Sequence, residues 1–175
     1  MLFGGCVKQF GTLDESLIFF AKNCGASEEQ FEQIIPMLQS INIKSLGENY
    51  HMFLEGESKS VVNAKDVVGS TVKYYNGDNL YDLLVCIDDK RVENYINYLM
   101  CDNVFNRDNI NGVMNGVAGV VDEDGNLFVS EGNHRILTLK ALIAIKEYIT
   151  GEEVKVPGFN MTVFNLQKDS KFNMQ

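Results

Sequence analysis

The chain has 175 residues, a formal net charge of −9 at pH 7 and an isoelectric point of about 4.7. Hydrophobic residues make up 45% of it and charged residues 22%, which excludes a disordered chain or a coiled coil and favours one folded domain, alone or with a small appended one. Because no run of Lys and Arg offsets the negative charge, we do not expect tight binding to nucleic acid.

The N-terminus and the cysteines indicate the cellular compartment. The first apolar stretch is too short for a signal peptide, and no window approaches the ~18 apolar residues of a membrane span, so we expect no membrane contact. The four cysteines, which are too far apart for a Cys-x-x-Cys pair, are interpreted as small core residues in a reducing environment; they are Cys6, Cys24, Cys86 and Cys101. We therefore expect a cytoplasmic protein.

The N-terminal part of the chain predicts two helices. Residues 13–24 combine early acidic residues with a broad apolar face, and Gly25 is a helix stop signal. Ser27 opens a capping-box-like pattern before a second helix whose apolar side chains recur three and four positions apart; these are Phe31, Ile34, Ile35 and Leu38. Pro36 lies inside that pattern, and we expect it to kink or shorten the helix.

These helices suggest how the chain is divided. We expect residues 1–57 to form a small helical segment that offers a docking face for a protein partner, and residues 58–175 to form the main domain. The polar stretch 55–60 is typical of a linker between the two.

The sequence becomes strand-like at residue 60. β-branched and aromatic residues over 60–75, interrupted by Gly69, predict extended structure with a break, and residues 75–79 predict a turn. Residues 80–87 fit either a helix or a strand.

A further helix is predicted over residues 88–100, with Asp88 as its N-cap. Its apolar side chains have helical spacing; they are Val92, Tyr95, Ile96 and Leu99. The Asn-rich stretch 101–116 predicts a loop. Asp88 and Asp89 most simply mark the helix start, with a smaller chance that they face a ligand site.

A β-hairpin follows the loop. Two short apolar runs, 116–121 and 127–130, flank an Asp-Gly turn signal at 122–126. The acidic turn resembles a calcium loop only loosely, because Gly125 is fourth from Asp122 rather than sixth, so a plain hairpin turn is preferred.

The next element is a helix over residues 134–150. It is apolar on nearly every side except a stripe near Lys140 and Glu147, which predicts a largely buried helix that Gly151 ends. Strand-like residues return over 154–165.

The junction between the hairpin and this helix carries the most informative residues. A helix N-terminus has unpaired N–H groups and a partial positive charge, and Gly132 would let an anion approach the backbone. Arg135 could grip phosphate oxygens, His134 could donate to them or move a proton, and Glu131 could hold a metal ion or orient the arginine. An exposed His-Arg pair without a ligand is the plainer interpretation. For His51, which has no partner near it in sequence, a surface or half-buried role is expected.

The stretch GVAGVVDEDGNLFVSEGNHRILTLKAL (116–142) resembles the signature segment of the ParB/sulfiredoxin superfamily. KDVVGS (65–70) is similar to the opening strand of that family, and KRVENYINYL (90–99) to its helix before the hairpin, so the resemblance spans 61–166. It implies an α+β fold with a small mixed sheet and packed helices, preceded here by the helical segment.

The resemblance also implies a phosphate-binding site. In the family, this loop and helix start bind nucleotide phosphates, which assigns that role to Gly132, Asn133, His134 and Arg135. Sulfiredoxins have their nucleophilic cysteine where this chain has Asn133, so we do not expect sulfinic acid reductase activity. Arg107, in the loop before the hairpin, is expected to fold over the phosphates.

Centromere-binding members of the family carry a further helix-turn-helix domain. The chain ends nine residues past Leu166, so that activity is not expected either.

Three functions remain open. The first is hydrolysis or phosphoryl transfer from a nucleoside triphosphate, ATP or CTP, with Mg²⁺ at Glu131 and proton transfer by Glu131 or His134. The second is a metal-dependent nuclease. The third is a non-catalytic nucleotide sensor or a regulator that binds another protein.

Overall fold

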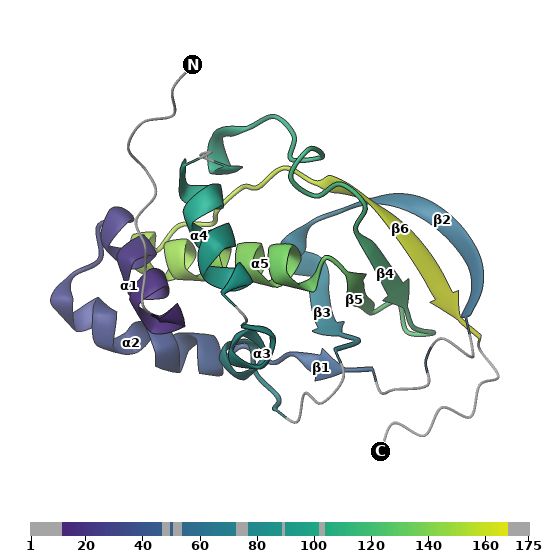
Figure 1. Cartoon of the computed structure of the whole chain (residues 1–175), viewed down its shortest axis with the longest axis horizontal. Coiled ribbons are helices and arrows are strands. Elements are labelled where there is room, and N and C mark those ends of the chain that lie inside the picture. The colour runs from purple at the N-terminus through teal and green to yellow at the C-terminus, as the bar shows by residue number, and fades with distance from the viewer. Residues whose placement is uncertain are drawn as a thin grey trace.

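The computed structural model describes residues 12–46, 50, 54–72, 77–88, 90–101 and 104–167, and these form a mixed α+β structure (Figure 1). Its strands are β1 (Lys44–Ser45), β2 (Leu54–Val62), β3 (Val67–Ser70), β4 (Ala118–Val121), β5 (Leu127–Glu131) and β6 (Phe159–Leu166). They form one mixed sheet in the order β1-β3-β5-β4-β6-β2. The α+β class expected from the sequence is therefore confirmed.

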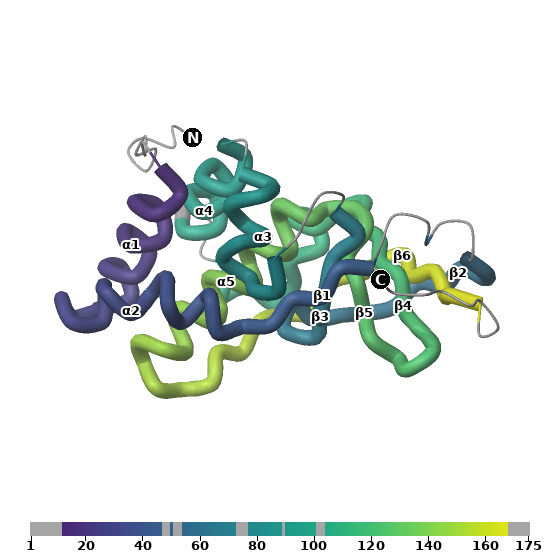
Figure 2. The backbone as a smooth tube through the Cα atoms, turned by 90° about the horizontal axis from the view of Figure 1, so that it is seen from below, coloured from purple at the N-terminus to yellow at the C-terminus, as the bar shows by residue number. Residues whose placement is uncertain are grey.

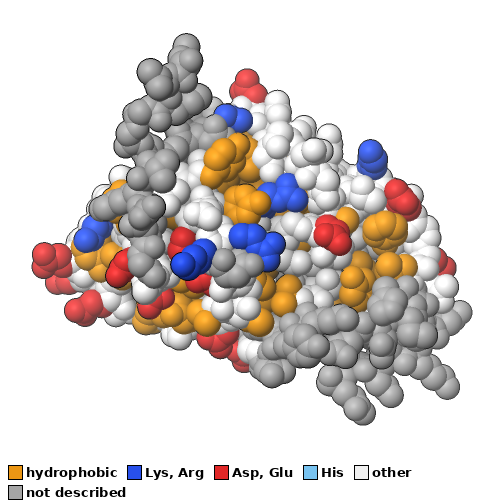
Figure 3. Space-filling model, viewed as in Figure 1, with side chains coloured by type: hydrophobic (Ala, Val, Ile, Leu, Met, Phe, Trp, Pro, Cys, Tyr) orange, Lys and Arg blue, Asp and Glu red, His pale blue; other side chains and the backbone are white. Residues whose placement is uncertain are grey.

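The helices lie beside one end of this sheet. In the described residues they are α1 (Leu13–Asn23), α2 (Glu28–Gln39), α3 (Leu80–Ile87), α4 (Arg91–Cys101) and α5 (Asn133–Thr150), with short 3-10 turns η2 (Ala64–Asp66) and η3 (Val104–Asn106). Figure 1 shows α5 running from the sheet toward α1, and Figure 2 shows α1 and α2 at the end of the molecule away from β2 and β6. Acidic side chains gather at the α1–α2 end of the face in Figure 3.

Both predicted N-terminal helices are present. Ser27 and Gln30 form the capping box: the Ser27 N–H donates to Gln30 Oε1 (2.9 Å), and the Gln30 N–H donates to Ser27 Oγ (3.3 Å). The expectation that Pro36 shortens the second helix is wrong, because α2 continues to Gln39. Pro36 and Glu32 both lie on the exposed face, where water can hydrate the Glu32 carbonyl that the proline ring leaves without a donor.

The expected linker at 55–60 is a strand instead. These residues form most of β2, which pairs antiparallel with β6 from Leu54 opposite Leu166 to Val62 opposite Phe159. Their side chains are exposed, so the backbone hydrogen bonds to β6 hold the strand rather than burial of its side chains. The boundary expected at residue 57 falls inside this strand, and β1 from the first segment pairs with β3 in the same sheet.

The two middle helices differ in part from expectation. Residues 80–87 form helix α3, and Asn79 Oδ1 caps it by accepting from the Asp82 N–H (2.9 Å). Asp88 is not the N-cap of the next helix, because it ends α3, and α4 begins only at Arg91. Its Oδ1 accepts instead from the N–H of Lys90 (3.1 Å), a residue with a positive φ of 73°. The predicted turn at 75–79 lies partly outside the described residues.

The predicted hairpin is confirmed. Strands β4 and β5 pair antiparallel, and Asp122 Oδ1 accepts from the N–H groups of Asp124 (3.0 Å) and Asn126 (2.8 Å) in the turn between them. This carboxylate therefore stabilises the turn. The predicted loop over 101–116 contains the short turn η3 but no strand or α-helix after Cys101 in its described residues.

The buried helix predicted after the hairpin is α5. Its polar stripe contacts η2: Lys140 Nζ donates to the Lys65 carbonyl (2.9 Å), and Lys65 Nζ pairs with Glu147 Oε1 (2.6 Å). Gly151 ends the helix in a left-handed conformation with φ of 68°.

One hydrophobic core joins the helical N-terminal part to the rest, since Leu17 and Ile34 belong to the same buried cluster as Leu142. The expectation that the cysteines are core residues is wrong for Cys86, which is exposed, while Cys24 is half-buried. Cys6 and the side chain of Cys101 lie outside the described residues. Among the described helices, none has both the length and the apolar character needed to cross a membrane.

Candidate functional site

A cleft of about 560 Å³ opens at the junction of β5 and α5. Its walls come from the ends of β3 and α3, the first turns of α4, and the junction itself; they are formed by Val72, Cys86, Ile87, Asp88, Arg91, Tyr95, Glu131, Gly132, Asn133, His134 and Arg135. The five consecutive residues predicted at 131–135 therefore line one cleft. Arg107, which is exposed, is not among the lining residues, and His51 and Asp89 lie outside the described residues.

Gly132 permits the tight turn from β5 into α5. Its φ is 89°, in the left-handed region that residues with a Cβ rarely adopt. A Cβ at this position would lie 2.5 Å from Val117 Cγ1, which is too close for any side chain without displacement. Because glycine has no side chain, the N-cap offers no oxygen to the N–H groups of the first turn of α5. This helix start is available to an anion in the cleft.

Asn133 ties the helix start to two strands. Its Oδ1 accepts from the buried Ser70 hydroxyl (2.6 Å), and its Nδ2 donates to the Ser130 carbonyl (3.2 Å). The Ser70 hydroxyl oxygen accepts in turn from the Val72 N–H (3.1 Å). The amide therefore joins β3 and β5 beneath the cleft, a positioning role that a cysteine could not fill with the same two bonds.

His134 connects the start of α5 to the end of α3. Its Nε2 lies 2.8 Å from the Ile87 carbonyl oxygen, an acceptor, so Nε2 carries a proton and donates it. This bond gives His134 a structural contact that sequence reasoning did not foresee.

Arg135 holds the loop before β4. Its Nη1 donates to the carbonyl oxygens of Val113 (3.1 Å) and Asn115 (2.7 Å). These bonds offset part of the unfavourable free energy of placing a cation in the first turn of a helix. Its Nη2 lies beside Gly132, because a Cβ built on that glycine would be 3.3 Å from it. Nη1 of the guanidinium thus holds the loop, while Nη2 lies next to the helix start.

Of the remaining lining residues, the sequence suggested only Asp88, as an alternative to its role at a helix start, and it did not suggest Arg91 or Tyr95. Arg91 and Tyr95 lie one turn apart on α4 and therefore on the same face of that helix. Their spacing is visible in the sequence, but the sequence does not say which face of α4 turns toward α5.

A pair of carboxyl groups lies at the wall of the cleft. Glu93 is buried, and burial raises its pKa from 4.5 to about 7, with a further contribution from its hydrogen bond to Asp88. The second oxygen of Glu93, Oε2, is buried and has no hydrogen-bond partner among the described residues. Asp88 lines the cleft and Glu93 does not, so the hydrogen bond between them connects the buried carboxyl group to the cleft wall.

The cleft does not contain a complete metal site of its own. No group of three or more His, Cys, Asp or Glu side chains that could hold a metal ion occurs in the part of the chain that the structure describes. Glu131, exposed at the end of β5, is the carboxylate adjacent to the helix start.

We found no match to the chain among models of known protein families, among curated proteins or among solved structures.

Proposed function

We propose that the cleft binds a nucleoside triphosphate with its phosphates at the start of α5. The observation that carries the proposal is the uncapped N-terminus of an 18-residue helix facing a cleft that Arg91 and Arg135 line. Such a helix start offers several backbone N–H donors and a partial positive charge to phosphate oxygens. The ParB/sulfiredoxin resemblance, kept as a prediction, makes ATP and CTP the first nucleotides to test.

Both arginines would contact phosphates, and Arg135 would also hold the loop before β4. Arg135 uses Nη1 for the loop carbonyls, and its Nη2 is positioned beside Gly132 to donate to a phosphate. Arg91 approaches from α4, across the cleft, and would neutralise a second phosphate. Tyr95, one turn further along α4, offers an aromatic face to the base.

Magnesium fits this site as part of the ligand. Mg²⁺ is commonly held by one or two carboxylates together with substrate phosphates and water, and it does not require a cage made of protein alone. Glu131 is the residue that would hold it, and the ion would neutralise charge on the phosphates.

Hydrolysis or phosphoryl transfer needs a group that accepts a proton from the attacking water or hydroxyl. We assign this role to the Asp88–Glu93 pair rather than to His134, because His134 Nε2 already donates to the Ile87 carbonyl. Asp88→Asn is expected to lower phosphate release at least about tenfold while nucleotide still binds.

The proposal is tested by melting temperature with a panel of nucleotides, with and without Mg²⁺. Binding to the native state raises stability by mass action, so ATP or CTP should raise the melting temperature of the wild type. Arg91→Met should lose this increase, whereas Arg107→Met, which changes an exposed arginine outside the cleft lining, should keep it. An unchanged melting temperature of the wild type with every nucleotide at about 5 mM would contradict the proposal.

A non-catalytic nucleotide sensor is the second candidate. The hydrogen bond from His134 Nε2 to the Ile87 carbonyl favours binding without turnover, because it engages the histidine that the sequence suggested for proton transfer. Recovery of intact nucleotide after long incubation with a protein whose melting temperature it raises would select this candidate over the enzyme.

A further inference from the structure

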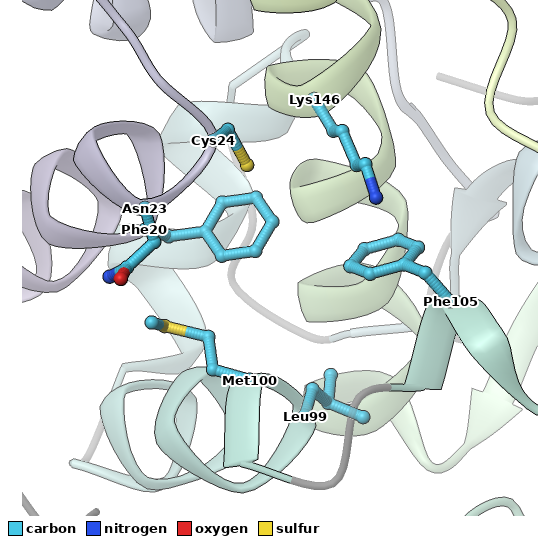
Figure 4. A pocket seen from close by; sticks show the side chains of 7 residues that line it. All are labelled: Phe20, Asn23, Cys24, Leu99, Met100, Phe105 and Lys146. Atoms are coloured by element: carbon cyan, nitrogen blue, oxygen red, sulfur yellow. The ribbon is translucent and has the colours of Figure 1, made fainter.

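A second, smaller cavity lies at the C-terminal end of α4, whereas the proposed nucleotide cleft lies at the first turns of that helix. It has a volume of about 220 Å³, is open to solvent and is lined by residues of α1, α4, α5 and η3 and by Cys24 (Figure 4). Figure 4 shows the ring of Phe20, the thioether of Met100 and the side chain of Leu99 around its centre, with Phe105 opposite Phe20. The two rings are 6.0 Å apart between centroids and tilted by 34°. Apart from Asn23 and Lys146, the lining side chains are apolar or weakly polar, and they suit an apolar body rather than a sugar or a phosphate.

One cation lies at the wall of this cavity. The Lys146 ammonium is 4.5 Å from the centroid of the Phe105 ring, and Figure 4 shows it pointing toward that ring. Within the described part of the chain, Lys146 forms no ion pair, and none of the described lining residues is acidic. A positive charge beside an apolar cavity attracts a ligand that carries one negative charge.

The Cys24 thiol also faces the cavity in Figure 4. Burial raises its pKa, and the nearby Lys146 ammonium opposes that increase only in part. The thiolate is therefore scarce at neutral pH, which argues against a nucleophilic role and leaves Cys24 as a wall residue whose alkylation can report occupancy.

We infer that this cavity is a binding site for a small carboxylic acid with an aromatic or branched aliphatic body. The body packs against the neighbouring rings of Phe20 and Phe105 and against Met100 and Leu99. Its carboxylate accepts a hydrogen bond from Lys146. The volume is below the ~300 Å³ at which drug-sized pockets begin, so the ligand carries a single ring or a short branched chain. This site is independent of the proposed nucleotide cleft.

The test measures binding of 3-phenylpropanoate to the full chain by calorimetry, with uncharged 3-phenylpropanol as the matched ligand. The acid should bind with a dissociation constant below about 1 mM, and the alcohol at least about tenfold more weakly, because it lacks the charge-assisted hydrogen bond. Lys146→Met should weaken binding of the acid to the level of the alcohol. The dissociation constant of the acid from Lys146→Arg should stay within about threefold of the wild-type value.

Lys22→Met is the control variant, because Lys22 also lies over a ring, Phe31 at 5.2 Å, but does not line the cavity. It should bind the acid as the wild type does. The location is checked by alkylation with N-ethylmaleimide and peptide mapping: the acid should slow alkylation of Cys24 and leave that of the exposed Cys86 unchanged. The inference would be overturned if the acid does not bind, or if the alcohol binds as tightly as the acid. It would also be overturned if Lys146→Met binds the acid as the wild type does, or if the acid does not slow alkylation of Cys24.

Discussion

At the scale of single residues, the junction of β5 and α5 depends on Gly132 for two separate reasons. Its φ of 89° disfavours any side chain, and the space that a Cβ would occupy is taken by Val117 Cγ1. Gly125 has a similar φ of 83° but nothing within 4 Å of a built Cβ. Substitution of Gly125 therefore measures the cost of backbone strain alone, whereas substitution of Gly132 adds the cost of steric contact with Val117.

We predict that Gly132→Ala lowers the free energy of unfolding by about 2–4 kcal/mol and Gly125→Ala by about 1 kcal/mol. Chemical denaturation of both variants measures the difference. The double variant Gly132→Ala/Val117→Ala should recover part of the additional loss, because it removes the contacting methyl groups. Equal losses in the two single variants would show that Val117 does not restrict this position.

Glu93 gives the stability of the protein a defined pH dependence. Because its pKa rises from 4.5 to about 7 on folding, the folded protein binds this proton more tightly than the unfolded chain does. The stabilisation is therefore complete below pH 4.5 and is lost as the pH rises through about 7.

Glu93→Gln carries no charge and keeps an N–H donor for Asp88. In the wild type, the free energy of unfolding decreases between about pH 5 and about pH 8 as Glu93 loses its proton. In Glu93→Gln we expect this decrease to be smaller by about 1–3 kcal/mol. Denaturation curves at several pH values measure this. Glu57→Gln, at an exposed position of β2, is the control and should leave the pH profile as it is in the wild type. An identical profile in Glu93→Gln would contradict the raised pKa.

At the scale of the elements, helix α4 contributes to both cavities: its first turns line the proposed nucleotide cleft, and its last turn lines the smaller cavity. Tyr95 lines the proposed nucleotide cleft, whereas Tyr98 on the same helix is 49% exposed and lines neither cavity. If Tyr95 stacks on the base, Tyr95→Leu should weaken nucleotide binding about tenfold, since one stacked base contributes about 1–3 kcal/mol. Tyr98→Leu should bind as the wild type does. Calorimetric titration measures both, and equal affinities would remove Tyr95 from the site.

The elements differ in how far the sequence predicts them. The hairpin and α5 are predictable because local signals mark both ends: the Asp-Gly turn for the hairpin, and Gly132 and Gly151 for the helix. β2 is not, because its polar side chains are exposed and its pairing with β6 is a contact between residues distant in sequence. The sequence predicts that residues 131–135 meet at a helix start, and they line one cleft; that Arg91 and Tyr95 also line it was not predictable, because the packing of α4 decides which way its side chains turn.

At the scale of the whole molecule, the chain has a net charge of −9, and on the face in Figure 3 its charged side chains are unevenly distributed. Acidic side chains gather at the α1–α2 end, whereas Lys and Arg side chains lie near the centre of the face in Figure 3, beside hydrophobic ones. Both proposed ligands are small anions, and the cations that would meet them are few: Arg91 and Arg135 at the cleft and Lys146 at the smaller cavity. This arrangement suits small anionic ligands better than a polyanion, which would meet the acidic surface along its length.

The central claim, that phosphates bind at the start of α5, is tested most directly by ¹H–¹⁵N NMR titration of the chain with ATP or CTP and Mg²⁺. We predict that the largest and saturable shifts occur at the backbone amides of Asn133, His134 and Arg135, because their N–H groups would donate to the phosphate oxygens. Unchanged amide signals at these three residues under saturating nucleotide, or shifts confined to another part of the chain, would contradict the claim.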